Sequence, residues 1–159
     1  MPTNLSAEIL VDEGKKLYGL GKIDEALPKF LEASLKNPTS AEIFNNIGLI
    51  YKKKDDPAQA ENYYKKALVV KPDYVEALNN LGVLKANAGE PLDAAIYLKK
   101  ALEVNSTYAD AYFNLAVLND GEGNFREAIA NYKSFLQYTE TDDNNLMDKI
   151  RGRIEQLSE

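Results

Sequence analysis

The sequence predicts an all-α fold, a solenoid in which antiparallel helix pairs stack and each pair covers its neighbour. A 34-residue pattern recurs four times without a gap, in units that begin at Ala7, Ala41, Val75 and Ala109. Small residues return at the eighth place of each unit (Gly14, Gly48, Gly82, Ala116) and at the twentieth (Ala26, Ala60, Ala94, Ala128). Bulky apolar residues return at the twenty-fourth place, as Phe30, Tyr64, Leu98 and Tyr132. One unit of this size cannot bury its own apolar face, so the repeats must stack.

Each unit contains two helical patterns. In the second unit the first pattern lies between Ala41 and Lys54, where apolar or small residues fall at i, i+3, i+4 and i+7: Phe44, Ile47, Gly48 and Tyr51. This spacing places them on one face of an amphipathic helix. A second helix is predicted after Pro57, with the same spacing at Ala60, Tyr64, Ala67 and Leu68. We expect the small residues to mark the helix crossing, with Gly48 over Ala60 and Gly82 over Ala94.

The turn between the two helices carries its own signals. Gly21, Gly89 and Gly123 stand where the first helix should end, and Asp55 takes that place in the second unit. Glycine adopts the left-handed backbone of a helix stop without steric cost, and aspartate tolerates it better than most residues. Asp56 and Asn124 are expected to cap the second helices that follow them.

We expect residues 1–159 to form a single domain with repeats at 7–40, 41–74, 75–108 and 109–142. A terminal helix is predicted at about 144–158, because Leu146, Ile150, Ile154 and Leu157 share one face. This helix would cover the last repeat and present Lys149, Arg151 and Arg153 to water.

Composition excludes several classes of function. The formal charge is −6, with 10 acidic against 5 basic residues in 109–159, so no basic face for nucleic acid is indicated. Cysteine and histidine are absent, which removes thiolate nucleophiles and the commonest metal ligands; we expect neither a cofactor nor a metal. No apolar run is long enough for a membrane span and the first residues lack a secretion signal, so a cytoplasmic location is expected.

The repeats resemble the tetratricopeptide repeat (TPR) family from about Ala7 to Asp142. The best match runs Asn-Asn-Ile-Gly-Leu-Ile-Tyr from Asn45 to Tyr51, followed by Ala60, Tyr64, Ala67 and Pro72. The resemblance implies a right-handed superhelix in which the first helix of each pair lines a concave groove. It also implies contact between ligand backbone and asparagines at the matching place of the first helices.

The candidate groove residues are asparagines, lysines and apolar residues of these first helices: Lys15, Asn45, Asn46, Leu49, Lys52, Lys53, Asn79, Asn80, Val83, Phe113, Asn114 and Val117. Asn46, Asn80 and Asn114 would form a ladder for a peptide backbone, because an amide side chain both donates and accepts hydrogen bonds. Plain packing is the alternative for these asparagines, and half of the apolar residues could belong to the core between helices. The acidic residues at the second place, such as Glu42 and Asp110, fit capping boxes with Thr39 and Thr107, or an acidic rim of the groove.

The sequence therefore predicts a non-catalytic scaffold or adaptor that binds an extended peptide or a partner's helix. No catalytic constellation is apparent, since the acid pairs lie at helix starts, where carboxylates cap amides. A clamp for a peptide carboxylate is disfavoured, because Val11 and Glu76 stand where it would need positive charge. The alternative function is a self-assembling scaffold that uses its last repeat or terminal helix, with a homo-oligomer as the product.

Overall fold

The computed structural model describes residues 3–159, with side chains from Ser6 onward, and confirms the all-α prediction. The described chain folds into nine helices: α1 (Thr3–Gly19), α2 (Ile23–Lys36), α3 (Ala41–Lys53), α4 (Pro57–Val70), α5 (Val75–Asn87), α6 (Pro91–Val104), α7 (Ala109–Gly121), α8 (Phe125–Tyr138) and α9 (Asn144–Leu157). The second helices of the pairs begin at residues 23, 57, 91 and 125, which keeps the 34-residue period. No described helix is long and apolar enough to cross a membrane.

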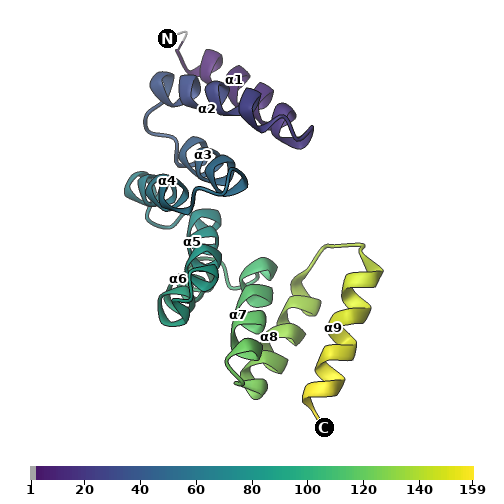
Figure 1. Ribbon diagram of the computed structural model, residues 1–159. Coiled ribbons are helices and arrows are strands. Elements are labelled where there is room, and N and C mark those ends of the chain that lie inside the picture. The colour runs from purple at the N-terminus through teal and green to yellow at the C-terminus, as the bar shows by residue number, and fades with distance from the viewer. Residues whose placement is uncertain (1–2) are drawn as a thin grey trace. The chain divides into compact units, whose positions relative to one another are not determined.

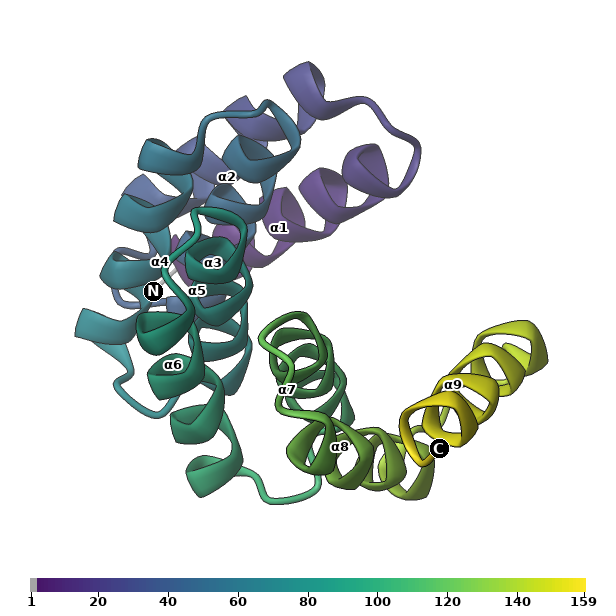
Figure 2. The same ribbon diagram turned by 60° about the horizontal axis from the view of Figure 1, so that its bottom comes forward.

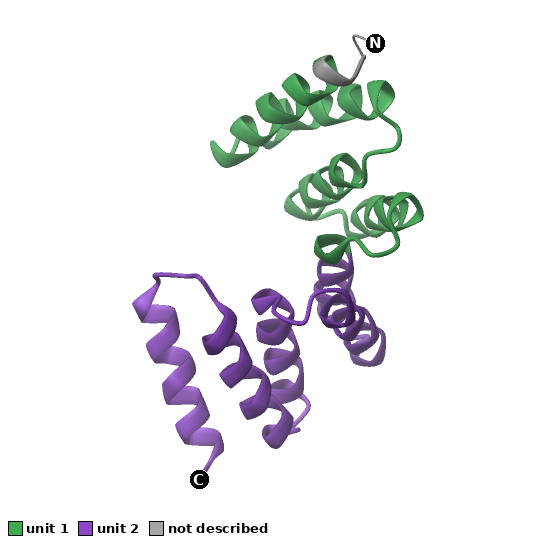
Figure 3. Ribbon diagram, turned by 180° about the vertical axis from the view of Figure 1, so that it is seen from behind, with its two compact units in different colours: residues 1–77 green, residues 78–159 purple. Residues whose placement is uncertain are grey.

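The chain divides into two compact units, residues 1–77 and 78–159 (Figure 3). The boundary falls inside α5, so that the first turn of this helix belongs to unit 1. The repeat boundaries, and the expectation that residues 1–159 act as one domain, stay predictions.

Unit 1 holds two antiparallel helix pairs, α1 with α2 and α3 with α4 (Figure 1). Its main core joins α2 to α3 through buried residues that include Phe30, Ala33, Ile43 and Ile47. A smaller cluster of Ala41, Ala67 and Ala77 packs α3 and α4 against the start of α5. Alanine at these places lets the helix backbones approach closely.

In unit 2, α6 packs on α7, α7 pairs with α8, and α9 lies along α8 (Figures 1 and 2). The core beneath α9 contains Ala116, Ala128, Tyr132, Phe135 and Ile150. The terminal helix was therefore predicted correctly, and its apolar face covers the last helix pair.

The glycine at the eighth place of a repeat lies under the bulky residue at the twenty-fourth. A Cβ added to Gly14 would lie 2.9 Å from the Phe30 ring, and one added to Gly48 would lie 2.5 Å from the Tyr64 ring. At Gly82 it would lie 2.5 Å from Leu98 Cγ and 3.2 Å from the Ala94 carbonyl oxygen. The expected approach of Gly82 to Ala94 is confirmed, whereas at Gly48 the nearest atoms belong to the ring of Tyr64, and the approach of Gly48 to Ala60 stays a prediction.

The predicted left-handed turn residues are all confirmed, whereas the predicted helix caps are confirmed only in part. Gly21, Gly89 and Gly123 have φ of 74°, 75° and 76°, and Asp55 has φ of 59°. Asp56 caps α4, since its Oδ1 accepts a hydrogen bond from Gln59 N at 3.0 Å. Asn124 makes no side-chain cap to α8, so that prediction was wrong.

The threonine caps were also wrong. Thr39 Oγ1 donates to Asn37 Oδ1 at 3.1 Å, and Thr107 Oγ1 donates to Asn105 Oδ1 at 2.9 Å. Both threonines are thus held in the turn before the helix, and Ser40 caps α3 instead. An asparagine two residues upstream competes for the threonine and prevents a capping box.

Candidate functional site

Unit 1 contains an acidic recess where α1 meets the start of α3. Its volume is about 230 Å³, and it is lined by Ala7, Glu8, Val11, Asp12, Lys15, Asn37, Ser40, Glu42 and Ile43. Three of these side chains are carboxylates. Lys15 Nζ pairs with Glu42 Oε1 across the recess and neutralises one of them.

A second, smaller hollow adjoins it, which we call the Asn46 recess. It measures about 70 Å³ and is lined by Lys15, Tyr18, Phe30, Asn46 and Leu49. Asn46 Nδ2 is buried and finds no hydrogen-bond partner among the described residues. A buried amide hydrogen without an acceptor costs about 1–3 kcal/mol. The recess therefore offers a donor to any carbonyl oxygen that enters it.

The two lysines near the end of α3 remain exposed, and neither makes an ion pair with a described residue. Partial burial lowers the pKa of the Lys52 ammonium below its usual range, and the neighbouring charge of Lys53 lowers it further. Both effects disfavour the charged lysine, and a nearby carboxylate would offset them.

Two of the predicted asparagines are buried. Asn45 is 4% exposed and Asn79 is 7% exposed, so neither presents its amide to a ligand. Asn79 Oδ1 accepts a hydrogen bond of 2.8 Å from Asn114 Nδ2, which links α5 to α7 within unit 2. For this pair the packing interpretation holds. Asn80 and Asn114 remain partly accessible.

Unit 2 contains a larger opening, the α5–α7 cleft. Its volume is about 320 Å³. Its lining comes from α5, α6, α7 and the residue that follows α7: Val83, Ala86, Asn87, Leu98, Asn114, Val117, Leu118, Gly121 and Glu122. Val83, Asn114 and Val117 were predicted, and the structure brings them together. Val117 is about half exposed although it is apolar.

Phe113 is partly buried and packs against the core of unit 2. Its ring lies 5.3 Å from the ring of Phe135 and 6.4 Å from that of Tyr132, measured between centroids. Val11 is buried in the core of unit 1. Sequence spacing could not separate these residues from Leu49 and Val117, because groove and core positions are adjacent on one helix face.

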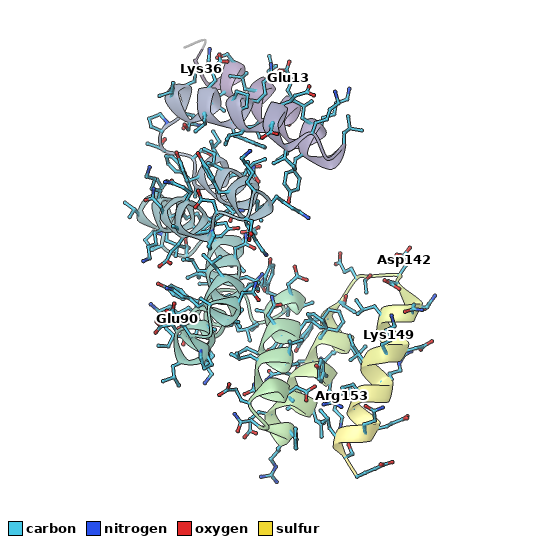
Figure 4. All side chains as sticks on the ribbon, viewed as in Figure 1. Glu13, Lys36, Glu90, Asp142, Lys149 and Arg153 are labelled. Carbon is cyan, nitrogen blue, oxygen red and sulfur yellow. The ribbon has the colours of Figure 1, made fainter. Side chains whose placement is uncertain are left out.

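Sequence reasoning missed an ion pair between α7 and α9. Arg153 Nη2 and Nε donate to the two carboxylate oxygens of Asp120, at 2.7 and 2.8 Å. Tyr132 Oη lies 3.3 Å from the same carboxylate. Arg153 was predicted to face water, but it instead links α9 to α7. Figure 4 marks its position on α9. No sequence signal pairs residues so far apart in the chain.

Among the described residues, no group of three histidine, cysteine or acidic side chains is placed to hold a metal ion. The hollows offer amides, ammonium groups, carboxylates and apolar walls. Such groups bind and orient a peptide.

Three family models of the tetratricopeptide repeat match residues 41–74, 75–108 and 97–130, together more than half of the chain. The third match begins inside α6 and thus pairs the second helix of one repeat with the first helix of the next. The type IV pilus assembly protein PilF of Pseudomonas aeruginosa is 35% identical over 65 residues, which are 40% of this chain but only 26% of PilF.

Solved structures share the fold. The crystal structure of MamA has a TM-score of 0.73 and 23% identity, covering 83% of this chain and 77% of MamA. The first TPR of Spaghetti (RPAP3), bound to an HSP90 peptide, has a TM-score of 0.70 and 20% identity, covering 76% of this chain and 95% of that one. The repeat period, the helix pairs and these matches lead to one conclusion: the chain belongs to the tetratricopeptide repeat family.

Proposed function

We propose that this protein is a non-catalytic scaffold that binds an extended peptide segment of a partner protein along α1 and α3 of unit 1. The buried and unpaired Nδ2 of Asn46 carries the proposal. A peptide carbonyl placed in the Asn46 recess would accept this hydrogen bond and remove the cost of the unpaired donor. Tyr18 and Leu49 would contact the adjoining part of the ligand.

Charge at the end of α3 supports an acidic residue in the ligand. Lys52 and Lys53 lie on the last turn of α3, where the helix dipole is negative and a basic side chain is stabilised. A ligand carboxylate near Lys52 would raise the lowered pKa of that lysine, so binding and protonation favour each other.

The comparisons support the coarser part of this proposal, a protein-interaction module. The RPAP3 repeat domain was solved with a bound HSP90 peptide, and that ligand is a property of RPAP3. A non-catalytic role fits the side chains of the three hollows, which provide contacts for a ligand and no nucleophile paired with a base.

The proposal is tested by selecting short peptides from a random display library on the intact protein and measuring their affinity by calorimetry. Asn46→Ala removes the unpaired donor, so binding should weaken by about tenfold or more. Asn62→Ala is the matched control, because Asn62 is exposed on α4 and lines none of the three hollows. Equal affinity of the Asn46→Ala variant and the unaltered protein would refute the role of this recess.

The alternative of self-assembly through the terminal helix receives less support. The apolar face of α9 already packs on α8, with Ile150 only 4% exposed. Assembly by this route would first have to displace α9 from its own unit.

A further inference from the structure

The Asn46 recess of unit 1 and the α5–α7 cleft of unit 2 occupy the same place in the repeat pattern, two repeats apart. Five lining residues correspond one to one: Lys15 with Val83, Tyr18 with Ala86, Phe30 with Leu98, Asn46 with Asn114, and Leu49 with Val117. The repeat architecture thus places a hollow at the same position in both units, and the two hollows differ in the side chains that line them.

The first difference is size. The hollow measures about 70 Å³ in unit 1 and about 320 Å³ in unit 2. Tyr18 lines the narrow hollow, whereas Ala86 leaves that space open. Lys15 likewise gives way to Val83, so that the wider hollow has no basic residue in its lining. Its floor is Leu98, which is fully buried.

The second difference is the charge at the rim. Gly121 and Glu122 line the cleft in unit 2, and the matching residues of the second repeat are Lys53 and Lys54. At this place the charge changes from the basic Lys54, which pairs with Asp24 and does not line the Asn46 recess, to the acidic Glu122, which lines the cleft. The surroundings agree with this change, because residues 78–159 contain 13 acidic and 8 basic side chains, whereas residues 1–77 contain 12 and 11.

The third difference is the orientation of the asparagine. Asn114 donates from Nδ2 to Asn79 Oδ1, which fixes the amide and leaves Oδ1 to accept. Asn46 has the opposite requirement, since its Nδ2 still needs an acceptor. Asn114 can therefore accept a peptide N–H through Oδ1 and still donate its second Nδ2 hydrogen, whereas Asn46 calls for a peptide carbonyl oxygen.

We infer that the α5–α7 cleft is a second peptide subsite, which accepts one bulky apolar side chain flanked by a lysine or arginine. The apolar side chain would lie above the buried Leu98 and cover Val83 and Val117, which removes their exposed apolar surface and its own from water. The basic residue would lie at Glu122. The inference relies on the proposed function for the nature of the partner, a protein segment, but it concerns different residues.

The test uses the full chain and two capped dipeptides, acetyl-phenylalanyl-lysine amide and acetyl-phenylalanyl-glutamate amide. Both are titrated at millimolar concentration into the ¹⁵N-labelled protein and followed by amide chemical shifts. We expect the lysine dipeptide to shift the amides of Ala86, Asn87, Gly121 and Glu122, with an affinity several times that of the glutamate dipeptide. Glu122→Gln should remove this preference.

Ala86→Tyr places in the cleft the side chain that Tyr18 places in the narrow recess, and it should weaken binding of the lysine dipeptide by about tenfold or more. Ala130→Tyr is the matched control, because Ala130 is exposed on α8 and lies outside the cleft lining. Circular dichroism checks that both variants keep their helices.

Three results would overturn the inference: no shift at these amides, shifts that persist in Ala86→Tyr, or equal affinity for the two dipeptides. Asn46→Ala should leave the response of the cleft unchanged. Asn46→Ala therefore tests the proposal for unit 1, whereas Ala86→Tyr and Glu122→Gln test the inference for the α5–α7 cleft.

Discussion

At the scale of single residues, the contact between a glycine and a bulky side chain sets how closely the helices of a pair approach. Gly48 leaves room for the ring of Tyr64, which is completely buried between α3 and α4. Burial raises the pKa of the Tyr64 hydroxyl, and this hydroxyl finds no partner among the described residues. The ring therefore contributes to the core through its volume and not through a hydrogen bond of its hydroxyl.

Gly48→Ala should destabilise the protein by about 1–3 kcal/mol, because its Cβ would fall 2.5 Å from the Tyr64 ring and force the pair apart. Urea unfolding followed by circular dichroism measures the effect. Gly152→Ala is the control, because nothing lies within 4 Å of a Cβ there; it should stabilise α9 by about 1 kcal/mol through helix propensity. Equal effects of the two substitutions would contradict the packing argument.

At the scale of elements, α9 is held by both apolar and charged contacts. Ile150 enters the core beneath it, and Arg153 binds Asp120 at the end of α7. The hydrogen bonds from Arg153 hold the pKa of the Asp120 carboxyl below its usual 3.8, although partial burial acts against them. The docking of α9 is thus linked to the protonation of one carboxyl group.

Because the folded-state pKa of Asp120 is lowered, its contribution to docking is complete above about pH 4 and is lost as the pH falls through the lowered pKa. Hydrogen exchange of the α9 amides should therefore accelerate severalfold below pH 4, after correction for intrinsic rates. Asp120→Asn should show the faster exchange at neutral pH and lose this pH dependence. Asp148→Asn, which removes only the pair with Arg151 inside α9, should leave the profile unchanged.

Helix periods were readable from the sequence because they depend on local spacing. The starts of α2 to α8 agree with the 34-residue repeat, and the four left-handed turn residues were identified by type. The site was only partly readable. Asn46 and Asn114 line two of the hollows, and their role as ligand contacts stays a prediction. The burial of Asn45 and Asn79 depends on the neighbouring helix, which spacing on one helix does not describe. Arg153 was assigned to water for the same reason, since its partner lies on α7.

At the scale of the whole molecule, α9 closes the chain of helix pairs. The core beneath it contains Phe135 and Ile150, and the apolar residues Leu146, Ile154 and Leu157 of α9 pack against that core. An uncovered pair of this kind presents an apolar face that can associate with another copy.

A chain that ends at Asp143 should therefore self-associate, with a mass in multi-angle light scattering that rises with protein concentration. The full chain should keep one mass over the same range, because α9 already covers the face. A truncated chain of constant mass would mean that the exposed face is too small to drive association.

The ion pair of Arg153 has a further consequence, for the chemical ageing of the protein. Asp120 precedes Gly121. An aspartate followed by glycine forms a cyclic imide, and then isoaspartate, more readily than an aspartate followed by a larger residue. Ring closure requires the side-chain carboxyl carbon to turn toward the nitrogen of Gly121. Both carboxylate oxygens of Asp120 are bound by the guanidinium group, and the residue lies inside α7. While α9 stays docked, Arg153 protects Asp120 from imide formation, and Asp120 in turn holds α9. Undocking of α9 would expose the Asp120–Gly121 linkage to irreversible conversion.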